Sequence, residues 1–429
     1  MKIVLKQVNL LNPDQKLDQK NDLLIENGII KKVGGIKDED IKSSQVFEFE
    51  NKICVPGLFD MHVHLREPGR EDEETVETGS NAAAAGGFTS VACMPNTNPD
   101  IDSAEIVRFI KEKAKGHLVE VYPVAAATLG RKGEALSPMF ELFESGAVAV
   151  SDDGTFIKTA GVLRSVMEYS RMFDAPIIEH CEDDSLADGT MNEGVTSTIL
   201  GLPAIPNIAE DLIVARDIMM AEFVGARIHI AHISTKGAVE LVRQAKKRGV
   251  KVTAEVAPHH FTLTEDTVKS FDTNYKMSPP LRTREDVDAL IIGLKDGTID
   301  CIASDHAPHS IEEKEMEFIY APNGIVGLET MLGLVLSELV HKKHLTVEQL
   351  VEKMSINPRK ILKMKIPQIK DGEPANLTII DKDIIWTVDI SKFKSKSKNS
   401  PFDSRLLTGR SIAVINNNKM YYEDRFFDI

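Results

Sequence analysis

This sequence of 429 residues lacks a positive net charge, a long apolar run and a dense set of cysteines. Its formal net charge of −15 argues against electrostatic binding of nucleic acid, but leaves an anionic small-molecule substrate open. No apolar run approaches the ~20 residues that span a bilayer, and the N-terminus shows no cleavage signal. The cysteines, Cys54, Cys93, Cys181 and Cys301, are widely spaced in apolar runs, which is typical of reduced thiols. We therefore expect a soluble cytoplasmic protein that binds neither nucleic acid nor membrane.

Short strand-like runs occupy both ends of the chain, residues 1–52 and 366–429. Each end carries a hairpin signal, Asn27-Gly28 in the first and Asn416 to Asn418 in the second. Neither end is long enough to bury a core alone, so we predict that the two together form one small β-sandwich domain. The basic, polar segment 392–400 is expected to be a solvated loop.

Between these ends, residues 53–365 alternate buried strands with amphipathic helices. The predicted strands end near His64, Asn96, Ala126, Asp152, His180, His232, Val256 and Asp305. The predicted helices cover residues 75–85, 103–115, 159–173, 208–224, 235–248 and 284–295. Eight such strands predict an α/β fold of the (β/α)₈ TIM-barrel type, with a doubly wound sheet as the alternative.

The first predicted barrel strand ends in a metal-ligand pattern. The apolar run 53–59 is expected to be one buried strand. Side chains alternate along a strand, so Asp60, His62 and His64 point to the same side. Two imidazoles two residues apart can hold one metal ion, although two structural histidines are the plain alternative.

Other predicted strand ends are also rich in ligand-type residues. Catalytic groups of barrel enzymes gather at these ends. The segments concerned are 151–154, 179–182, 229–232, 259–260 and 304–309. Four histidines plus carboxylates exceed what one zinc site needs. They would suit two metals ~3.5–4 Å apart, most simply zinc, with manganese, cobalt or iron as alternatives.

Several motifs together resemble a known family. Residues 60–69 and 304–309 look like the two signatures of cyclic amidohydrolases, and specifically of dihydroorotases. Segments 94–97, 151–154, 179–182 and 277–282 match in the same order. The resemblance covers essentially the whole chain, and its motifs are similar to those of the bacterial type I enzymes.

The resemblance implies a metal centre with two positions. His62 and His64 would hold the first metal, and His180 and His232 the second. Many relatives bridge the metals with a carbamylated lysine, but the nearest lysine to this strand end, Lys158, lies well beyond it.

The resemblance to the type I enzymes implies an aspartate as the bridge instead. We favour Asp153 over Asp152, since neighbours in a strand point in opposite directions. The resemblance also places Asp305 next to the metals, as the general base and acid.

The implied reaction is the reversible cyclisation of N-carbamoyl-L-aspartate to L-dihydroorotate with loss of water, the third step of de novo pyrimidine (UMP) biosynthesis. Arg66, at the rim of the mouth, could grip a substrate carboxylate in two places. The expected substrate contacts are His64, Arg66, Asn96, Ser278, His309, Asn323 and Gly324. The sequence departs from the family at Ser278, usually Asn, and at Asn323, usually Phe, which puts those two contacts in doubt.

Some alternatives stay open. The charged segment 311–317 is either a mobile loop over the site or an exposed surface loop. A hydantoinase or allantoinase is the second enzymatic interpretation, although those enzymes usually carry the bridging lysine. A metal-free scaffold for a partner is the third, and the full set of ligand-type residues argues against it. A homodimer is expected, and association with aspartate carbamoyltransferase stays open.

Overall fold

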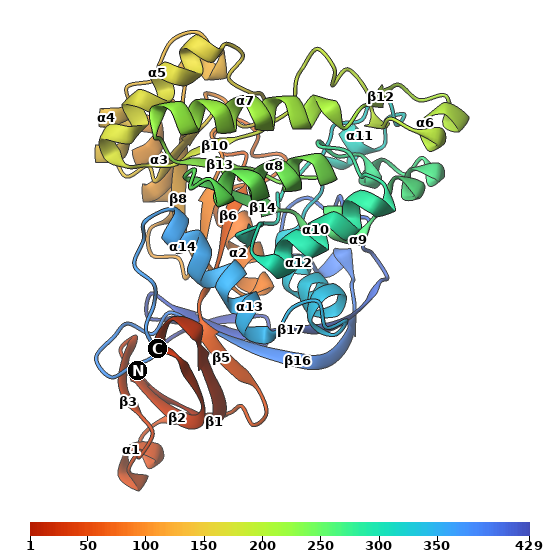
Figure 1. Cartoon of the computed structure of the whole chain (residues 1–429). Helices are drawn as coiled ribbons and strands as arrows, with labels where there is room; N and C mark the ends of the chain where they lie inside the picture. Colours follow the sequence, from red (N-terminus) through yellow and green to blue (C-terminus); the bar gives the residue numbers. More distant parts are fainter.

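A parallel sheet of eight strands forms the centre of the computed structural model, which describes residues 1–429 (Figure 1). The strands, in chain order, are β6 (Leu58–Val63), β7 (Phe88–Cys93), β8 (Glu120–Ala126), β9 (Ala149–Ser151), β10 (Ile177–Glu179), β13 (Ile228–Ile230), β14 (Val252–Val256) and β15 (Cys301–Ile302). The sheet runs in this order from β6 to β15. Its two edges meet just beyond β15, where Val63 and His306 form a parallel bridge and the His64 N–H donates to the His306 carbonyl at 2.8 Å. This closure confirms the barrel and rules out the doubly wound sheet.

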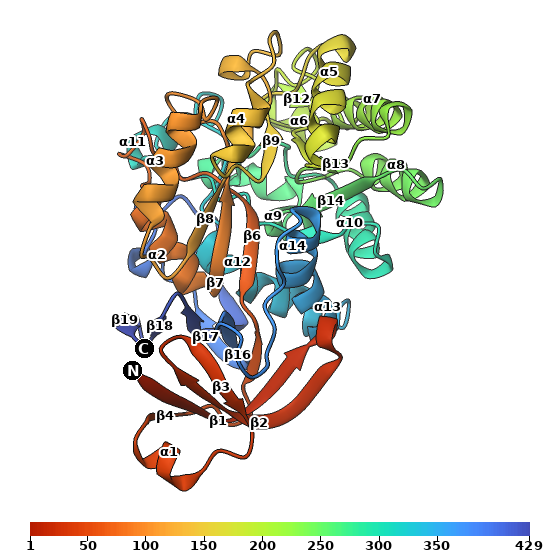
Figure 2. The same cartoon turned by 90° about the vertical axis from the view of Figure 1, so that its left-hand side faces the viewer.

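Helices cover the outside of the barrel (Figure 2). The longer ones are α2 (Val76–Gly86), α3 (Ala104–Ala114), α5 (Ala160–Ser170), α7 (Ile208–Val224), α8 (Lys236–Lys247), α10 (Arg284–Asp296) and α12 (Leu328–Leu334). Shorter ones are α4 (Met139–Glu144), α6 (Val195–Leu200), α9 (Pro258–Thr262), α11 (Ile311–Lys314), α13 (Val347–Val351) and α14 (Asn357–Ile361). Threonine hydroxyls cap α2, α5, α8 and α10, because they accept an otherwise free N–H of the first turn. The six predicted helices are confirmed to within a few residues at each end.

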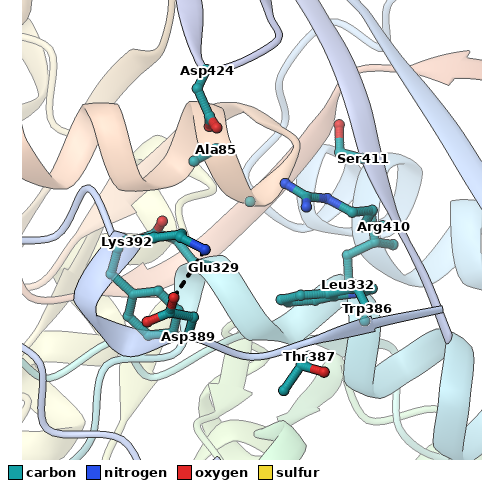
Figure 3. Close-up of a pocket in the computed structure, with 13 residues that line it drawn as sticks. Ala85, Glu329, Leu332, Trp386, Thr387, Asp389, Lys392, Arg410, Ser411 and Asp424 are labelled. Carbon is teal, nitrogen blue, oxygen red and sulfur yellow. Dashed lines mark ion pairs between the residues drawn. The ribbon is translucent and has the colours of Figure 1, made fainter. Parts of the chain in front are cut away.

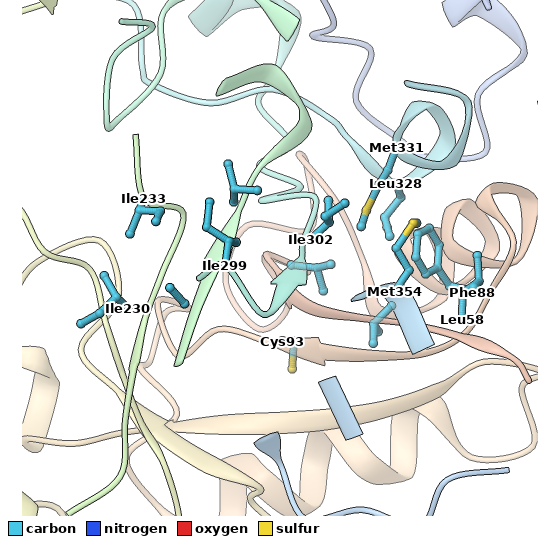
Figure 4. Close-up of a cluster of buried hydrophobic side chains, with 14 of the residues drawn as sticks. Leu58, Phe88, Cys93, Ile230, Ile233, Ile299, Ile302, Leu328, Met331 and Met354 are labelled. Atoms are coloured by element: carbon cyan, nitrogen blue, oxygen red, sulfur yellow. The ribbon is translucent and has the colours of Figure 1, made fainter. Parts of the chain in front are cut away.

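Apolar side chains between the strands and the helices fix this arrangement (Figure 4). Leu58, Phe88, Ile302, Leu328 and Met331 are examples, and all are buried. Fully burying one such side chain contributes about 1.5–3 kcal/mol, so the packed layer holds the strand ends in place around the mouth. No helix is both long and apolar enough to cross a membrane. All four cysteines are buried and unbridged.

The predicted strand 53–59 is interrupted at Gly57. β5 (Ile53–Pro56) pairs with strands of the terminal sheet, whereas β6 begins the barrel. A Cβ on Gly57 would lie 2.1 Å from Asn376 Oδ1 and 2.2 Å from Thr89 Oγ1, so only glycine fits where the chain crosses between the two sheets. The domain boundary at residue 52 remains a prediction.

Strands from both ends of the chain form one nine-stranded mixed sheet. Besides β5 it contains β1 (Lys2–Asn12), β2 (Leu17–Glu26), β3 (Ile29–Val33), β4 (Gln45–Glu48), β16 (Leu377–Thr387), β17 (Leu406–Asn416), β18 (Lys419–Tyr422) and β19 (Arg425–Asp428). Both predicted hairpins are present, between β2 and β3 and between β17 and β18. Leu5 and Leu23 share a core with Leu377 and Ile415, so the two ends of the chain depend on each other. Figures 1 and 2 show this sheet at one end of the barrel, close to both termini.

The segment 392–400, which we call the strap, is not the solvated loop that its composition predicts. Ser395, Ser397 and Asn399 are buried, and the lysines between them are more exposed. Serine and asparagine therefore alternate with lysine as along a strand, and the inward side chains bond to the barrel. The strap begins beside a cavity of about 160 Å³ in which Lys392 pairs with Asp389 at 3.0 Å and Glu329 lies on the wall (Figure 3).

Candidate metal centre and substrate pocket

A cavity of about 250 Å³ opens at the mouth of the barrel, where the strands end. Eleven of the twelve predicted site residues line it, namely His64, Arg66, Asn96, Asp153, His180, His232, Ser278, Asp305, His309, Asn323 and Gly324. The twelfth, His62, lies just below and is fully buried. The structure therefore brings together side chains that are up to 262 positions apart in the chain.

His62, His64 and Asp153 form the first group that could hold a metal. His62 Nε2 lies 3.3 Å from Asp153 Oδ1, and His64 Nε2 lies 3.7 Å from Asp153 Oδ2. The other ring nitrogens are held in place, because the His62 Nδ1–H donates to Glu255 Oε1 at 2.6 Å and the His64 Nδ1–H to Asn96 Oδ1 at 2.8 Å. These bonds leave both Nε2 atoms directed at Asp153, as metal-ligating histidines require.

Asp153, His180 and His232 form the second group, which shares Asp153 with the first. His180 Nδ1 lies 3.0 Å from His232 Nε2, and the latter is 3.9 Å from Asp153 Oδ1. A carboxylate common to both groups is the geometry of a bridging ligand.

Two buried atoms test whether the residues fit a divalent cation. His62 Nε2 and Asp153 Oδ1 are both buried and have no hydrogen-bond partner. His62 already donates through Nδ1. A positive charge is therefore needed at Nε2 to stabilise this nitrogen beside the Asp153 carboxylate. The residues therefore fit a divalent metal ion.

The electrostatics agree with this fit. Burial acts to raise the pKa of Asp153, but the neighbouring histidines, His62 above all, outweigh it and hold the pKa well below its usual range. Burial likewise acts to raise the pKa of Asp305, and the hydrogen bond with His64 and the neighbouring histidine charges lower it overall. Both carboxylates are thus negative at neutral pH.

Neither Asp152 nor Lys158 reaches the centre. Asp152 turns away and accepts a hydrogen bond from the Thr128 N–H at 2.9 Å. Lys158 is exposed and pairs with Asp184 at 3.0 Å. In this fold the only carboxylate at the end of β9 that faces the histidines is Asp153.

Asp305 lines the cavity beside the metal-ligand groups. Its Oδ1 is 3.2 Å from His64 Nε2 and 3.7 Å from His62 Nε2. Asp305 has φ +50° and His232 has φ +27°, so both adopt the left-handed backbone conformation that non-glycine residues rarely adopt. Strain of this kind persists where surrounding structure enforces it, typically at functional sites.

Arg66 and His309 face the cavity from one side and share a buried partner. Arg66 Nε lies 3.2 Å from Glu73 Oε2 and donates to the Pro308 carbonyl at 3.1 Å. His309 Nδ1 lies 3.0 Å from Glu73 Oε1. Glu73, which is 2% exposed, thus orients both expected substrate contacts.

The two departures from the family motifs have different surroundings. The Ser278 hydroxyl donates to Glu182 Oε2 at 2.6 Å, so its one donor is already used. The Asn323 side chain is exposed, whereas its carbonyl accepts a hydrogen bond from His309 Nε2 at 2.8 Å. In segment 311–317, Lys314 of α11 is buried and donates to the Pro322 and Gly324 carbonyls, so this segment is not simply an exposed loop.

Three site residues were missed by the sequence analysis: Glu73, Glu255 and Asn399. Glu255 carried a usable signal, because it is the only charged residue in the apolar strand β14. Glu73 carried none that distinguishes it from surface polar residues, and the signal for Asn399 is the alternation of lysine with serine and asparagine along 394–399. Conversely, Asp60 does point inward as predicted, but it accepts a hydrogen bond from the Ser304 N–H at 3.1 Å and joins no metal-ligand group.

A (β/α)₈ barrel with these two metal-ligand groups at its mouth has the architecture of the cyclic amidohydrolases, a class of hydrolases. Solved structures agree: the chain is similar to the L-hydantoinase (dihydropyrimidinase) from Arthrobacter aurescens, with a TM-score of 0.86 and 26% identity over 98% of this chain and 96% of that one. Similarity to the D-hydantoinase from Thermus sp., with a TM-score of 0.84 and 24% identity over 100% and 97% of the two chains, supports the fold.

Sequence relatives show which family of cyclic amidohydrolases the chain belongs to. Residues 51–238 match the family described as Dihydro-orotase-like. The chain is 51% identical to the dihydroorotase of Acetivibrio thermocellus over 95% of its own length and 96% of that protein. It is 48% identical to the dihydroorotase of Syntrophus aciditrophicus over 99% and 100% of the two chains. The chain belongs to the dihydroorotase family.

Proposed function

We propose that this protein interconverts N-carbamoyl-L-aspartate and L-dihydroorotate, the third step of pyrimidine biosynthesis, with two zinc ions per chain. The observation that carries the proposal is that one cavity contains both the shared Asp153 and a partly buried arginine, Arg66. Asp153, which belongs to both metal-ligand groups, suits hydrolysis of a cyclic amide. Arg66 suits a substrate that carries a carboxylate.

Four histidines and Asp153 would hold the metals. Imidazole together with carboxylate favours zinc over calcium or magnesium. When bound, the two ions would polarise the ring carbonyl and make a nucleophilic hydroxide available near neutral pH. The site is related to that of hydantoinases, but an aspartate here occupies the place that the resemblance gives to their bridging lysine.

Asp305 is the proposed proton carrier. During ring opening, a water O–H bond breaks, a C–O bond forms at the carbonyl carbon, and the C–N bond of the ring breaks. The proton taken by Asp305 ends on the leaving nitrogen, so hydrolysis and cyclisation use the same carboxylate in opposite protonation states. Its position at the cavity wall, 3.2 Å from His64 Nε2, supports this role.

Arg66 and His309 are the proposed contacts to the substrate carboxylate. A guanidinium can bind a carboxylate through two parallel hydrogen bonds. Glu73 offsets part of the positive charge and restrains both side chains, so little ordering remains to be done when the substrate binds. Asn96, Ser278 and the backbone at Gly324 complete the proposed pocket.

Substitution of Arg66 tests the substrate assignment. Arg66→Met removes one partner of a buried charged pair, which costs roughly 2–5 kcal/mol. We expect kcat/KM for dihydroorotate to fall about 30- to several-thousand-fold, with metal content unchanged. Arg66→Lys keeps the charge but not the planar guanidinium. Its kcat/KM should therefore lie between those of the wild type and Arg66→Met.

The same experiment distinguishes the hydantoinase interpretation. Dihydrouracil lacks the carboxylate, so the wild type should turn it over poorly, and Arg66→Met should not lower this turnover in parallel. Equal wild-type turnover of both rings would favour a hydantoinase. Loss of metal in Arg66→Met would instead mean that Arg66 supports the structure of the site.

The assembly and location of the protein remain predictions. A homodimer is tested by sedimentation of the purified chain, and association with aspartate carbamoyltransferase by repeating the measurement with that enzyme present. A cytoplasmic location is tested by cell fractionation.

A further inference from the structure

The strap contributes one buried side chain to the wall behind the substrate pocket. Asn399 is 6% exposed. Its Nδ2 donates to the Ala307 carbonyl at 3.0 Å and to the Gly324 carbonyl at 3.1 Å, and its Oδ1 accepts a hydrogen bond from the His309 N–H at 3.1 Å. The Asn399 carbonyl also accepts a hydrogen bond from the Val326 N–H at 2.9 Å. Both N–H groups and the oxygen of this side chain therefore bond to two loops.

These two loops carry proposed substrate contacts. The first follows β15 and carries His309, and the second contains Asn323 and Gly324. His309 Nε2 donates to the Asn323 carbonyl at 2.8 Å, so the loops also touch directly. Asn399 comes from outside both loops and bonds to each, so it sets the distance between them.

The strap itself is anchored at several points. The Glu329 carboxylate accepts hydrogen bonds from the Lys394 and Ser395 N–H groups at 2.8 Å and 3.1 Å. The Glu74 carboxylate accepts one from the Lys396 N–H at 3.1 Å. These bonds keep the backbone that precedes Asn399 in a fixed position. The bond to Glu74 is charge-assisted, because hydrogen bonding and the charge of His306 outweigh burial and lower the pKa of that carboxyl.

A further bond leads from the strap toward Arg66. The Ser397 hydroxyl donates to the Glu73 carbonyl at 2.7 Å, and the side chain of Glu73 orients Arg66 and His309. The strap thus bonds to Glu73, the residue that supports both proposed contacts to the substrate carboxylate. None of the side chains of the strap lines the substrate pocket.

We propose that Asn399 is a positioning residue for substrate binding, which acts through His309 and the Gly324 backbone. The inference rests on the proposed substrate contacts and extends them to the C-terminal segment of the chain. Because Asn399 touches neither the metal-ligand groups nor Asp305, it governs how tightly the substrate is held and leaves the chemical step unchanged.

Asn399→Ala tests the proposal by separating KM from kcat. The substitution leaves two buried carbonyls and one N–H without partners, and we expect KM for dihydroorotate to rise about 10- to 100-fold. The kcat and the metal content should stay close to wild type. Asn399→Asp retains the acceptor for the His309 N–H but places a carboxylate against two carbonyls. Its KM should therefore be at least as high as that of Asn399→Ala. If Asn399→Ala does not fold, Asn399→Ser takes its place.

Asn416→Ala is a matched control. Asn416 is also buried, at 5% exposure, and belongs to the same C-terminal segment. Its Nδ2 donates to the Leu118 carbonyl at 3.0 Å and to the Thr89 carbonyl at 3.4 Å, away from the mouth. Asn416→Ala should therefore lower the melting temperature of the protein without raising KM for dihydroorotate. A KM that rises equally in both variants would overturn the proposal, because loss of stability alone would explain it.

A double-mutant cycle with His309→Ala shows how Asn399 acts. Residues that act through one another are not additive, so the rise in KM of the double variant should be smaller than the product of the two single rises, and what Asn399→Ala still adds reports its action through the Gly324 backbone. Full additivity would overturn the proposal, as would an unchanged KM in Asn399→Ala. If His309→Ala alone leaves KM unchanged, the substrate contact itself is wrong, and the positioning role is refuted with it. Absence of dihydroorotate turnover in the wild type would instead refute the proposed function.

Discussion

The two halves of the metal centre differ in how their histidines are supported. In the first half, each of His62 and His64 donates its Nδ1–H to a buried acceptor, at 2.6 Å and 2.8 Å. In the second half, His232 Nδ1 has no hydrogen-bond partner, and His180 Nε2 lies 3.6 Å from the Glu182 carboxylate. Such outer contacts fix the ring orientation and raise the basicity of the ligand. The first position is therefore the better prepared of the two.

This difference implies unequal metal affinities in one centre. Asp153 belongs to both groups, so its loss should empty both positions. Substitution of a residue that contacts the histidines of one metal position should alter the metal affinity of that position alone. The expected effects decrease from the shared ligand, through the proton carrier, to the outer supports.

The largest effect is expected for Asp153→Asn. The substitution keeps the shape of the side chain but removes the negative charge that both metal positions share, so both ions and nearly all activity should be lost. Metal counts after gel filtration and ring-opening rates measure this. Asp152→Asn is the matched control, because Asp152 bonds to Thr128 instead. If Asp152→Asn loses more metal, the bridge is assigned to the wrong aspartate, and a modified lysine seen by mass spectrometry would refute the aspartate bridge.

The next effect is expected for Asp305→Asn, which removes the proposed proton carrier. Loss of a positioned acid or base costs about 10²- to 10⁴-fold in rate, and both directions should be affected. In the wild type, hydrolysis needs Asp305 ionised, so it should rise with pH only in the acid range below the usual pKa of an aspartate, because the pKa of Asp305 is lowered. Cyclisation needs Asp305 protonated and should fall as the pH rises. Rates measured in both directions across the same pH range check this. Parallel limbs in the two directions would argue against the role.

Most of the fold could be predicted from the sequence because it depends on local patterns. Helix caps, the Asn-Gly hairpin and the apolar or amphipathic pattern of each single strand or helix are short-range features of the chain. The approximate strand ends, and hence the meeting of His62, His180 and His232 at one mouth, follow from that order. The choice of Asp153 over Asp152 rested on strand alternation, and the structure places Asp153 against the histidines.

The remainder depends on contacts between distant segments. Glu255 is 193 positions from His62, and Asn399 is 90 positions from His309, so no local pattern pairs them. The strap was misjudged because its composition is that of a surface loop, although its alternating lysines are a strand-like signal. The break at Gly57 depends on side chains packed against it from Thr89 and Asn376.

The smallest effect concerns the supports themselves. Glu255→Gln removes the charge that holds the His62 Nδ1–H, and substitution of such outer partners typically costs 10- to 100-fold in metal affinity. We expect the ion of the first position to be released at a correspondingly lower chelator concentration, while the second is unchanged. Dialysis against graded chelator, with metal counted at each step, resolves the two releases.

Glu182→Gln is the counterpart in the second half. Its contact with His180 is 3.6 Å long, too long for a hydrogen bond, so the second ion should be released only slightly earlier than in the wild type. Because the second position is expected to be the weaker one in the wild type, Glu255→Gln should bring the two releases closer together, and Glu182→Gln should move them apart. If the two variants shift the releases in the opposite sense, the hydrogen bonds to His62 and His64 do not make the first position the tighter one. Equal shifts in both would mean that the two ions bind as a single unit through Asp153, and that support of one half is transmitted to the other.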